Sequence, residues 1–102
     1  MIRPYPALVT KLCHLGAWIV GSGADPDKKD PPRDWDVFVP YEFWHKAMLL
    51  IPDDAKPNTF GGWKCNSEGI EVDVWPDSLE RIMSNQGKFA WQPELNIRIK
   101  KL

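Results

Sequence analysis

Polar and hydrophobic residues alternate through residues 34–39 of this chain, which predicts a β-strand with two chemically different faces. One face carries Asp34, Asp36 and Phe38, and the other carries Trp35, Val37 and Val39. Pro40 follows and is expected to end the strand. Two carboxylates therefore stand side by side on a rigid support, which is costly unless a cation, a shared proton or open water compensates their charge.

The same alternation returns in residues 70–75 and predicts a second strand of this kind. Its apolar face carries Ile70, Val72 and Val74, and its polar face carries Glu71, Asp73 and Trp75. Residues 62–65 precede it, and the four-residue connection 66–69 ends in a glycine, so we expect a β-hairpin. In both strands we expect the apolar face to lie against helices and the carboxylate face to stay open.

Helical periodicity predicts the covering layer. Leucines at positions 8, 12 and 15 predict a helix over 7–15, and a second helix is predicted over 40–50. The inward positions of the second helix are Phe43 or Trp44, Ala47, Met48 and Ile51. A third helix is predicted to start with Asp77 as N-cap and Glu80 three residues later, and to end near residue 86 before Gly87.

The remaining segments complete an α+β fold with a mixed β-sheet covered on one face by helices. Residues 17–20 are apolar throughout and predict a strand buried on both faces. Residues 95–100 alternate and predict a final edge strand. The proline-containing segments 24–32 and 53–58 are expected to be loops. We expect residues 1–102 to form a single domain.

Composition and charge add few constraints. The chain has 102 residues, of which 43% are hydrophobic and 26% charged, and this balance is typical of one globular domain. A net charge of −1 gives no general attraction to nucleic acid or membrane. No run approaches the ~20 apolar residues that a bilayer requires, so we expect a cytoplasmic protein with no membrane partner. Cys13 and Cys65 make no disulfide framework and are expected to be reduced and buried.

Gly21, Ser22 and Gly23 follow the strand predicted at residues 17–20. Glycines at the end of a strand let the backbone approach a ligand closely, and Ser22 adds a hydroxyl donor. Gly-Ser-Gly alone is more often a plain turn. Here, however, it lies just beyond a buried strand, and this position favours phosphate binding.

Asp34, Asp36 and Asp73 are the candidate metal ligands, because carboxylates on rigid strands suit Mg²⁺ or Mn²⁺. Three carboxylates on neighbouring strands can hold two divalent ions, an arrangement that serves an in-line attack on the α-phosphate of a nucleotide. An Asp-x-Asp pair alone is more often a solvated strand face.

Taken together, these features resemble the nucleotidyltransferase superfamily, which includes DNA polymerase beta, tRNA CCA-adding enzymes and small antitoxin-type nucleotidyltransferases. The family pattern is an apolar strand, Gly-Ser or Gly-Gly, Asp-x-Asp about a dozen residues later, and a third Asp on a later strand. It is matched here by Val20-Gly21-Ser22, Asp34-Trp35-Asp36 and Val72-Asp73-Val74. The resemblance runs from about residue 8 to residue 83 and is greatest to small bacterial and phage members, and a phage protein would work in the host cytoplasm.

This resemblance implies a minimal, polymerase beta palm-like fold and a metal-dependent nucleotidyltransferase. Such an enzyme moves a nucleoside monophosphate from an NTP to a hydroxyl of a nucleic acid or protein, with Mg²⁺ or Mn²⁺ as cofactor. The implied catalytic and metal-binding residues are Asp34, Asp36 and Asp73. The implied phosphate-binding residues are Gly21, Ser22 and Gly23.

The chain departs from the family pattern in two ways. Most relatives carry a helix directly after the Gly-Ser turn, whereas residues 24–32 are broken by prolines, and Lys28, Lys29 or Arg33 would have to contact phosphate instead. Little chain remains for the helical domain that usually holds the base or the acceptor. A partner protein or a homo-oligomer would then complete the site, and the alternative function is a catalytically weak or inactive nucleotide-binding module that regulates a partner.

Three further residues have open interpretations. Glu71 shares the face of Asp73 and is either a fourth ligand or, as is more usual, an ion-paired or exposed side chain. Phe38 and Trp75 are either platforms on which a base stacks or ordinary packing residues.

Overall fold

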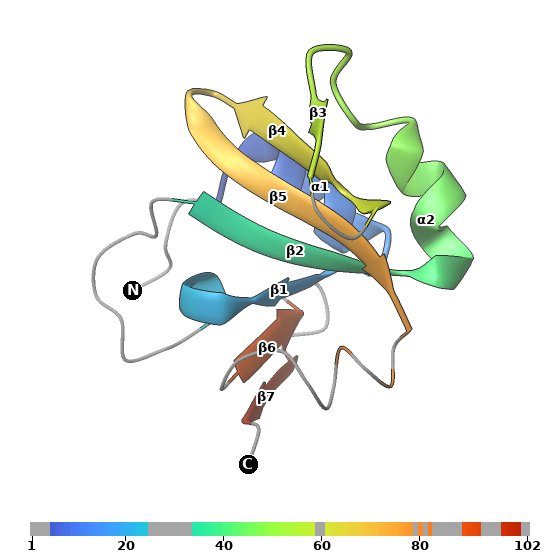
Figure 1. The fold of residues 1–102 in the computed structure, drawn as a ribbon. Helices are drawn as coiled ribbons and strands as arrows, with labels where there is room; N and C mark the ends of the chain where they lie inside the picture. Colours follow the sequence, from blue (N-terminus) through green and yellow to red (C-terminus); the bar gives the residue numbers. More distant parts are fainter. Residues whose placement is uncertain are drawn as a thin grey trace.

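The computed structural model describes residues 5–24, 34–58, 61–78, 80, 82, 89–92 and 97–100. Two α-helices and seven strands lie in this part of the chain (Figure 1). In chain order the elements are α1 (Ala7–His14), β1 (Trp18–Val20), the 3-10 helix η1 (Gly21–Ala24), β2 (Asp34–Pro40), α2 (Tyr41–Met48), β3 (Lys56–Pro57), β4 (Trp63–Ser67), β5 (Ile70–Asp77), β6 (Phe89–Gln92) and β7 (Ile97–Lys100). The helices predicted over 7–15 and 40–50 and the strands predicted over 17–20 and 34–39 are confirmed to within two residues.

The strands form one mixed sheet in the order β3-β4-β5-β2-β1-β6-β7, which confirms the α+β class (Figure 1). The two central strands, β2 and β5, run parallel, and the other paired strands in the described part run antiparallel. A parallel pair requires a crossover connection, and here α2, β3 and β4 lie between the two strands in the chain. The two polar faces predicted from sequence are therefore neighbours at the centre of the sheet.

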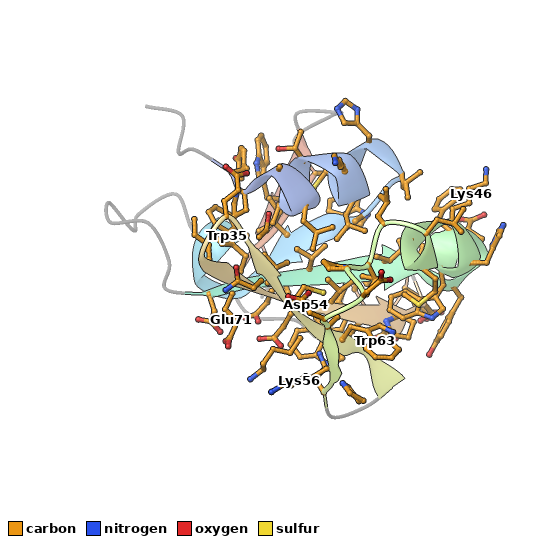
Figure 2. The ribbon with its side chains drawn as sticks, turned by 90° about the horizontal axis from the view of Figure 1, so that it is seen from above. Trp35, Lys46, Asp54, Lys56, Trp63 and Glu71 are labelled. Atoms are coloured by element: carbon orange, nitrogen blue, oxygen red, sulfur yellow. The ribbon has the colours of Figure 1, made fainter. Side chains whose placement is uncertain are left out.

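The main hydrophobic core lies between α1 and the apolar face of the sheet. The alternation in β2 buries Trp35, Val37 and Val39 completely or nearly so, and α2 adds Ala47 from its inward side. Figure 2 shows Trp35 on the side of β2 that faces α1. Full burial of an aliphatic side chain contributes about 1.5–3 kcal/mol, so this face fixes the orientation of β2 and β5. Both cysteines are free and buried, as predicted.

A second, smaller cluster covers part of the opposite face. Trp18 and Val20 of β1 pack there with Ile82 and the half-buried Phe38. Because Trp18 pairs with Phe38 and Val20 pairs with Asp36, this cluster borders the carboxylate face on the β1 side. The prediction that β1 is buried on both faces is confirmed.

Three local predictions differ from the structure. The predicted four-residue connection 66–69 is a two-residue turn, because Glu68 and Gly69 both adopt positive φ and so form the tight hairpin connection that suits twisted strands. The predicted loop 53–58 contains β3, which pairs with β4 at Lys64 and Trp63. Because β3 has only two residues, it shows no alternation that could have predicted it.

The predicted N-cap Asp77 lies instead at the end of β5, which continues because Pro76 and Asp77 pair with the end of β2. A helical turn follows, in which the Ile82 N–H donates to the Ser78 C=O at 3.0 Å. Residues 83–88, where that helix was predicted to end, lie outside the described residues.

At the far end of the sheet, β6 was not predicted, whereas β7 is the predicted edge strand. The Gln92 side chain on β6 donates to the Ala17 C=O at 2.7 Å, which ties β6 to the segment between α1 and β1. Neither α1 nor α2, nor any other helix within the described residues, is long and apolar enough to cross a membrane.

Candidate metal site

The parallel register of β2 and β5 brings the predicted carboxylates onto one surface. Asp34 pairs with Glu71 and Asp36 pairs with Asp73, so two carboxylates from each strand face the same side of the sheet. Figure 2 shows Glu71 on the side of the sheet opposite α1. The strands hold these side chains because the alternate residues of both are anchored in the main core.

Asp34, Glu71 and Asp73 form the tightest acidic group in the described part of the chain. Their ligand oxygens all lie within 4.8 Å of one another. Opposite ligands of a Mg²⁺ ion are separated by roughly 4.2 Å, so the group needs at most a small adjustment to surround such a cation. The donor set therefore fits a hard divalent cation, and three carboxylates in this arrangement could bind one.

Asp36 stands next to this group, on the side of η1. A Cβ built on Gly21 would lie 3.0 Å from Asp36 Oδ2, so a larger residue at position 21 would press against that carboxylate. Burial, followed by the charges of Asp34, Asp73 and Glu71, raises the pKa of Asp36 to about 6. The predicted trio of Asp34, Asp36 and Asp73 therefore shares one face, but the tight group contains Glu71 in place of Asp36.

Asp73 is the most enclosed member of the group, with only 6% of its surface exposed. Its Oδ1 atom is buried and has no hydrogen-bond partner among the described residues. Burial raises the pKa of Asp73, and the neighbouring Asn58 side chain and Lys64 partly offset this rise. A buried carboxylate oxygen without a partner is costly, which is typical of a site prepared for a ligand.

Lys64 supplies a positive charge at the edge of the acidic group. It lies opposite Asp73 in the β4–β5 register, and its Nζ is 3.7 Å from Glu71 Oε1. Both side chains are about half exposed, at 51% and 44%, so the ion pair is weak and easily rearranged. Glu71 is thus both ion-paired and a member of the acidic group. The two interpretations of this residue, metal ligand and ion-paired side chain, are therefore compatible.

The predicted phosphate-binding residues lie at the end of β1, in η1. Gly21 has φ of +70° and borders Asp36, whereas Gly23 is buried, and a Cβ built on it would lie 2.7 Å from the Trp35 ring. Gly23 therefore also serves the packing of Trp35. The side chain of Ser22 and the residues Lys28, Lys29 and Arg33 lie outside the described part of the chain.

Phe38 and Trp75 form a stacked pair two residues farther along β2 and β5 than Asp36 and Asp73. Their ring centroids are 5.2 Å apart and their planes are inclined by 23°. Both rings are half-buried, and Phe38 also packs against the smaller cluster around Trp18. The structure therefore supports the packing interpretation of Phe38 directly.

The alternation along the two strands predicts the carboxylate face but not every residue that belongs to it. Glu71 was recognised only as an optional ligand, because its distance from Asp34 depends on the pairing of strands remote in sequence. Asn58 was assigned to a loop, and no sequence pattern connects it with Asp73. Asn58 lies opposite Gly62 in the β3–β4 pair, and its side chain occupies the space that a side chain at position 62 would fill.

Comparison with protein-family models, with curated proteins and with solved structures found no match for this chain.

Proposed function

We propose that this protein is a minimal metal-dependent nucleotidyltransferase, which moves a nucleoside monophosphate from an NTP to a hydroxyl group of a nucleic acid or a protein. The observation that carries the proposal is the group of Asp34, Glu71 and Asp73, with ligand oxygens within 4.8 Å and one buried carboxylate oxygen without a described partner. A mixed sheet with this acidic face opposite its helices agrees with the palm-like fold that the sequence resembles.

The residues that would hold Mg²⁺ or Mn²⁺ are Asp34, Glu71 and Asp73, with Asp36 beside them. When bound, divalent cations would neutralise the triphosphate and favour ionisation of the attacking hydroxyl. Gly21 would let the backbone of η1 approach the phosphates, because it has no side chain that would stand between them.

Asp36 and Asp73 are the candidate proton acceptors of this reaction. Without a cation, burial is the main cause that raises both pKa values, that of Asp36 to about 6, and bound divalent cations would lower them again and keep both carboxylates ionised. Both carboxylates are fixed by strands whose opposite faces are buried, so their positions are rigid. Rigid placement is the main contribution that a protein makes to phosphoryl transfer.

A second candidate function is a nucleotide-binding module that regulates a partner protein without catalysis. It is favoured by Lys64, whose Nζ lies 3.7 Å from Glu71 and already balances part of the acidic charge. A lysine in this place suits stable binding of a nucleotide phosphate beside the carboxylates. In this case the NTP binds but no group is transferred.

Incubation of the protein with α-labelled NTPs, Mg²⁺ and cell lysate separates these functions. We expect a labelled macromolecule with the wild-type chain, none with Asp73→Asn, and undiminished labelling with Glu42→Gln, which changes an exposed carboxylate on α2. If Mg²⁺ and NTP raise the melting temperature but nothing is labelled, the binding module is correct. If neither effect occurs, both functions are wrong.

A further inference from the structure

Asn58 extends the pairing of β3 with β4 by one residue. Its backbone N–H donates to the Gly62 C=O at 3.0 Å, directly after the pair formed by Pro57 and Trp63. Asn58 therefore lies opposite Gly62 at the edge of the sheet, and the strands β4 and β5 separate it from β2.

The Asn58 side chain can extend toward β5 because Gly62 has no side chain in its way. A Cβ built on Gly62 would lie 2.6 Å from Asn58 Oδ1 and 2.7 Å from Trp75 Cδ1, and it would also meet the backbone oxygen of Val74. The Asn58 amide thus occupies space that any other residue at position 62 would fill. It reaches the surface of the sheet that carries Trp75 and Asp73.

The amide of Asn58 and the carboxylate of Asp73 are neighbouring polar groups, and each contains a buried atom that could hydrogen-bond to the other. Oδ1 and Nδ2 of Asn58 are buried and lack a hydrogen-bond partner within the described residues, and the same is true of Asp73 Oδ1. Asp73 is more than nine-tenths buried, and the Asn58 side chain lies close enough to favour its ionised form. A buried donor and a buried acceptor on the same face of the sheet are both stabilised when they form a hydrogen bond with each other.

We propose that Asn58 is a positioning residue of the metal site, whose amide N–H donates to one oxygen of Asp73 so that the other faces the cation shared with Asp34 and Glu71. This role rests on the proposed function, because it requires the acidic group to bind a divalent cation. Carboxylates that bind metals are commonly oriented by such hydrogen bonds from residues that do not touch the metal. Asn58 reaches Asp73 from the side of β4 and leaves the open face to the cation and its substrate.

Titration of the full chain with Mn²⁺, followed by the electron paramagnetic resonance signal of the free ion, tests this role. We expect Asn58→Ala to weaken Mn²⁺ binding by roughly 10- to 100-fold, as is usual when such an outer residue is lost. Asn58→Gln retains the amide and is expected to recover part of the affinity. Circular dichroism verifies that each variant is folded at the temperature of the titration, and Asn58→Ser replaces the alanine variant if that one does not fold.

Asn66→Ala is the matched control. Asn66 is an exposed asparagine on β4 whose side chain accepts a hydrogen bond from the Gly69 N–H at 3.0 Å, so its loss also removes one hydrogen bond. We expect its Mn²⁺ affinity to stay within about twofold of wild type, well below the 10- to 100-fold effect of losing an outer residue of a metal site. If folded Asn58→Ala binds Mn²⁺ as tightly as wild type, the role of Asn58 is overturned while the metal site stands. If the wild-type chain does not bind Mn²⁺, the metal site and the role of Asn58 are overturned together.

Discussion

Asp36 lies opposite Asp73 in the parallel register of β2 and β5, so two carboxylates share one face of the central strand pair. Their partners in the neighbouring register position, Asp34 and Glu71, add two more on the same face. Four acidic side chains on two adjacent strands repel one another and weaken the apo protein. This repulsion should be measurable in the stability of the apo protein and in its affinity for cations.

We expect Asp36→Asn to stabilise the apo protein at neutral pH. Burial and then the charges of Asp34, Asp73 and Glu71 raise the pKa of Asp36 from 3.8 to about 6. The native state therefore binds more protons than the unfolded state between these two values, and stability falls as pH rises through this range. Because water partly screens Asp36, the gain on neutralisation is about 1 kcal/mol, or roughly 4–8 °C in Tm.

Thermal unfolding at low salt, at a series of pH values from strongly acidic to mildly alkaline, checks this prediction. The difference in Tm between Asp36→Asn and wild type should be small in acid, grow through the pKa of Asp36, and level off above it. Glu42→Gln, which removes a carboxylate from the exposed side of α2, is the control. A lower Tm of Asp36→Asn at alkaline pH would mean that the Asp36 carboxylate has a stabilising partner.

We expect Glu71→Gln to weaken Mn²⁺ binding more than Asp36→Asn does. Glu71 belongs to the group whose oxygens lie within 4.8 Å of one another, whereas Asp36 stands beside it. Loss of a ligand charge should cost at least as much as loss of an outer residue, which is roughly 10-fold or more. Calorimetric titration with Mn²⁺ gives the two affinities, and equal affinities for wild type and Glu71→Gln would exclude Glu71 from the metal site.

Lys64→Gln should have opposite effects on two ligands. Removing the cation 3.7 Å from Glu71 leaves the acidic group more negative, so Mn²⁺ alone should bind more tightly, by up to about fivefold. Binding of NTP with Mg²⁺ should weaken, because the triphosphate loses a positive neighbour. Lys46→Gln, an exposed lysine on α2, is the control and should change neither affinity (Figure 2). Parallel changes for both ligands would contradict this role of Lys64.

Gly62→Ala should destabilise the protein by about 3 kcal/mol, near the upper end of the range for overpacking. The new Cβ would meet the backbone oxygen of Val74, which cannot move away as a side chain can, and it would also meet Asn58 and Trp75. Gly61→Asn is the control, because nothing lies within 4 Å of a Cβ there and asparagine tolerates its φ of +79°. Chemical denaturation measures both free energies of unfolding, and similar values for the two variants would show that position 62 is not crowded.

The sequence predicts β2 and β5 well because each carries a full alternation whose apolar half is long enough to fill a core. Trp35, Val37 and Val39 could be assigned to the buried side without any knowledge of their neighbours. The strands β3 and β6 were missed for the opposite reason. Neither carries an alternation, because β3 has only two residues and β6 reads Phe-Ala-Trp-Gln.

Only those residues of the candidate site that share one strand could be predicted from the sequence. Asp34 and Asp36 follow from the alternation of β2 alone. The inclusion of Glu71 depends on the β2–β5 register, and the placement of Asn58 depends on the empty space at Gly62. Side-chain distances between strands are set by tertiary pairing, which a pattern within either strand does not contain.

The acidic face is assembled from two strands whose paired residues Asp36 and Asp73 are 37 positions apart in the chain. Parallel pairing of this kind raises contact order, and chains of high contact order close their long loops late and fold slowly. During synthesis, a nascent chain that ends before β5 has all of β2 but only half of the face. Cation binding would therefore report completion of the β2–β5 pair, and it could serve as a kinetic probe of the last stage of folding.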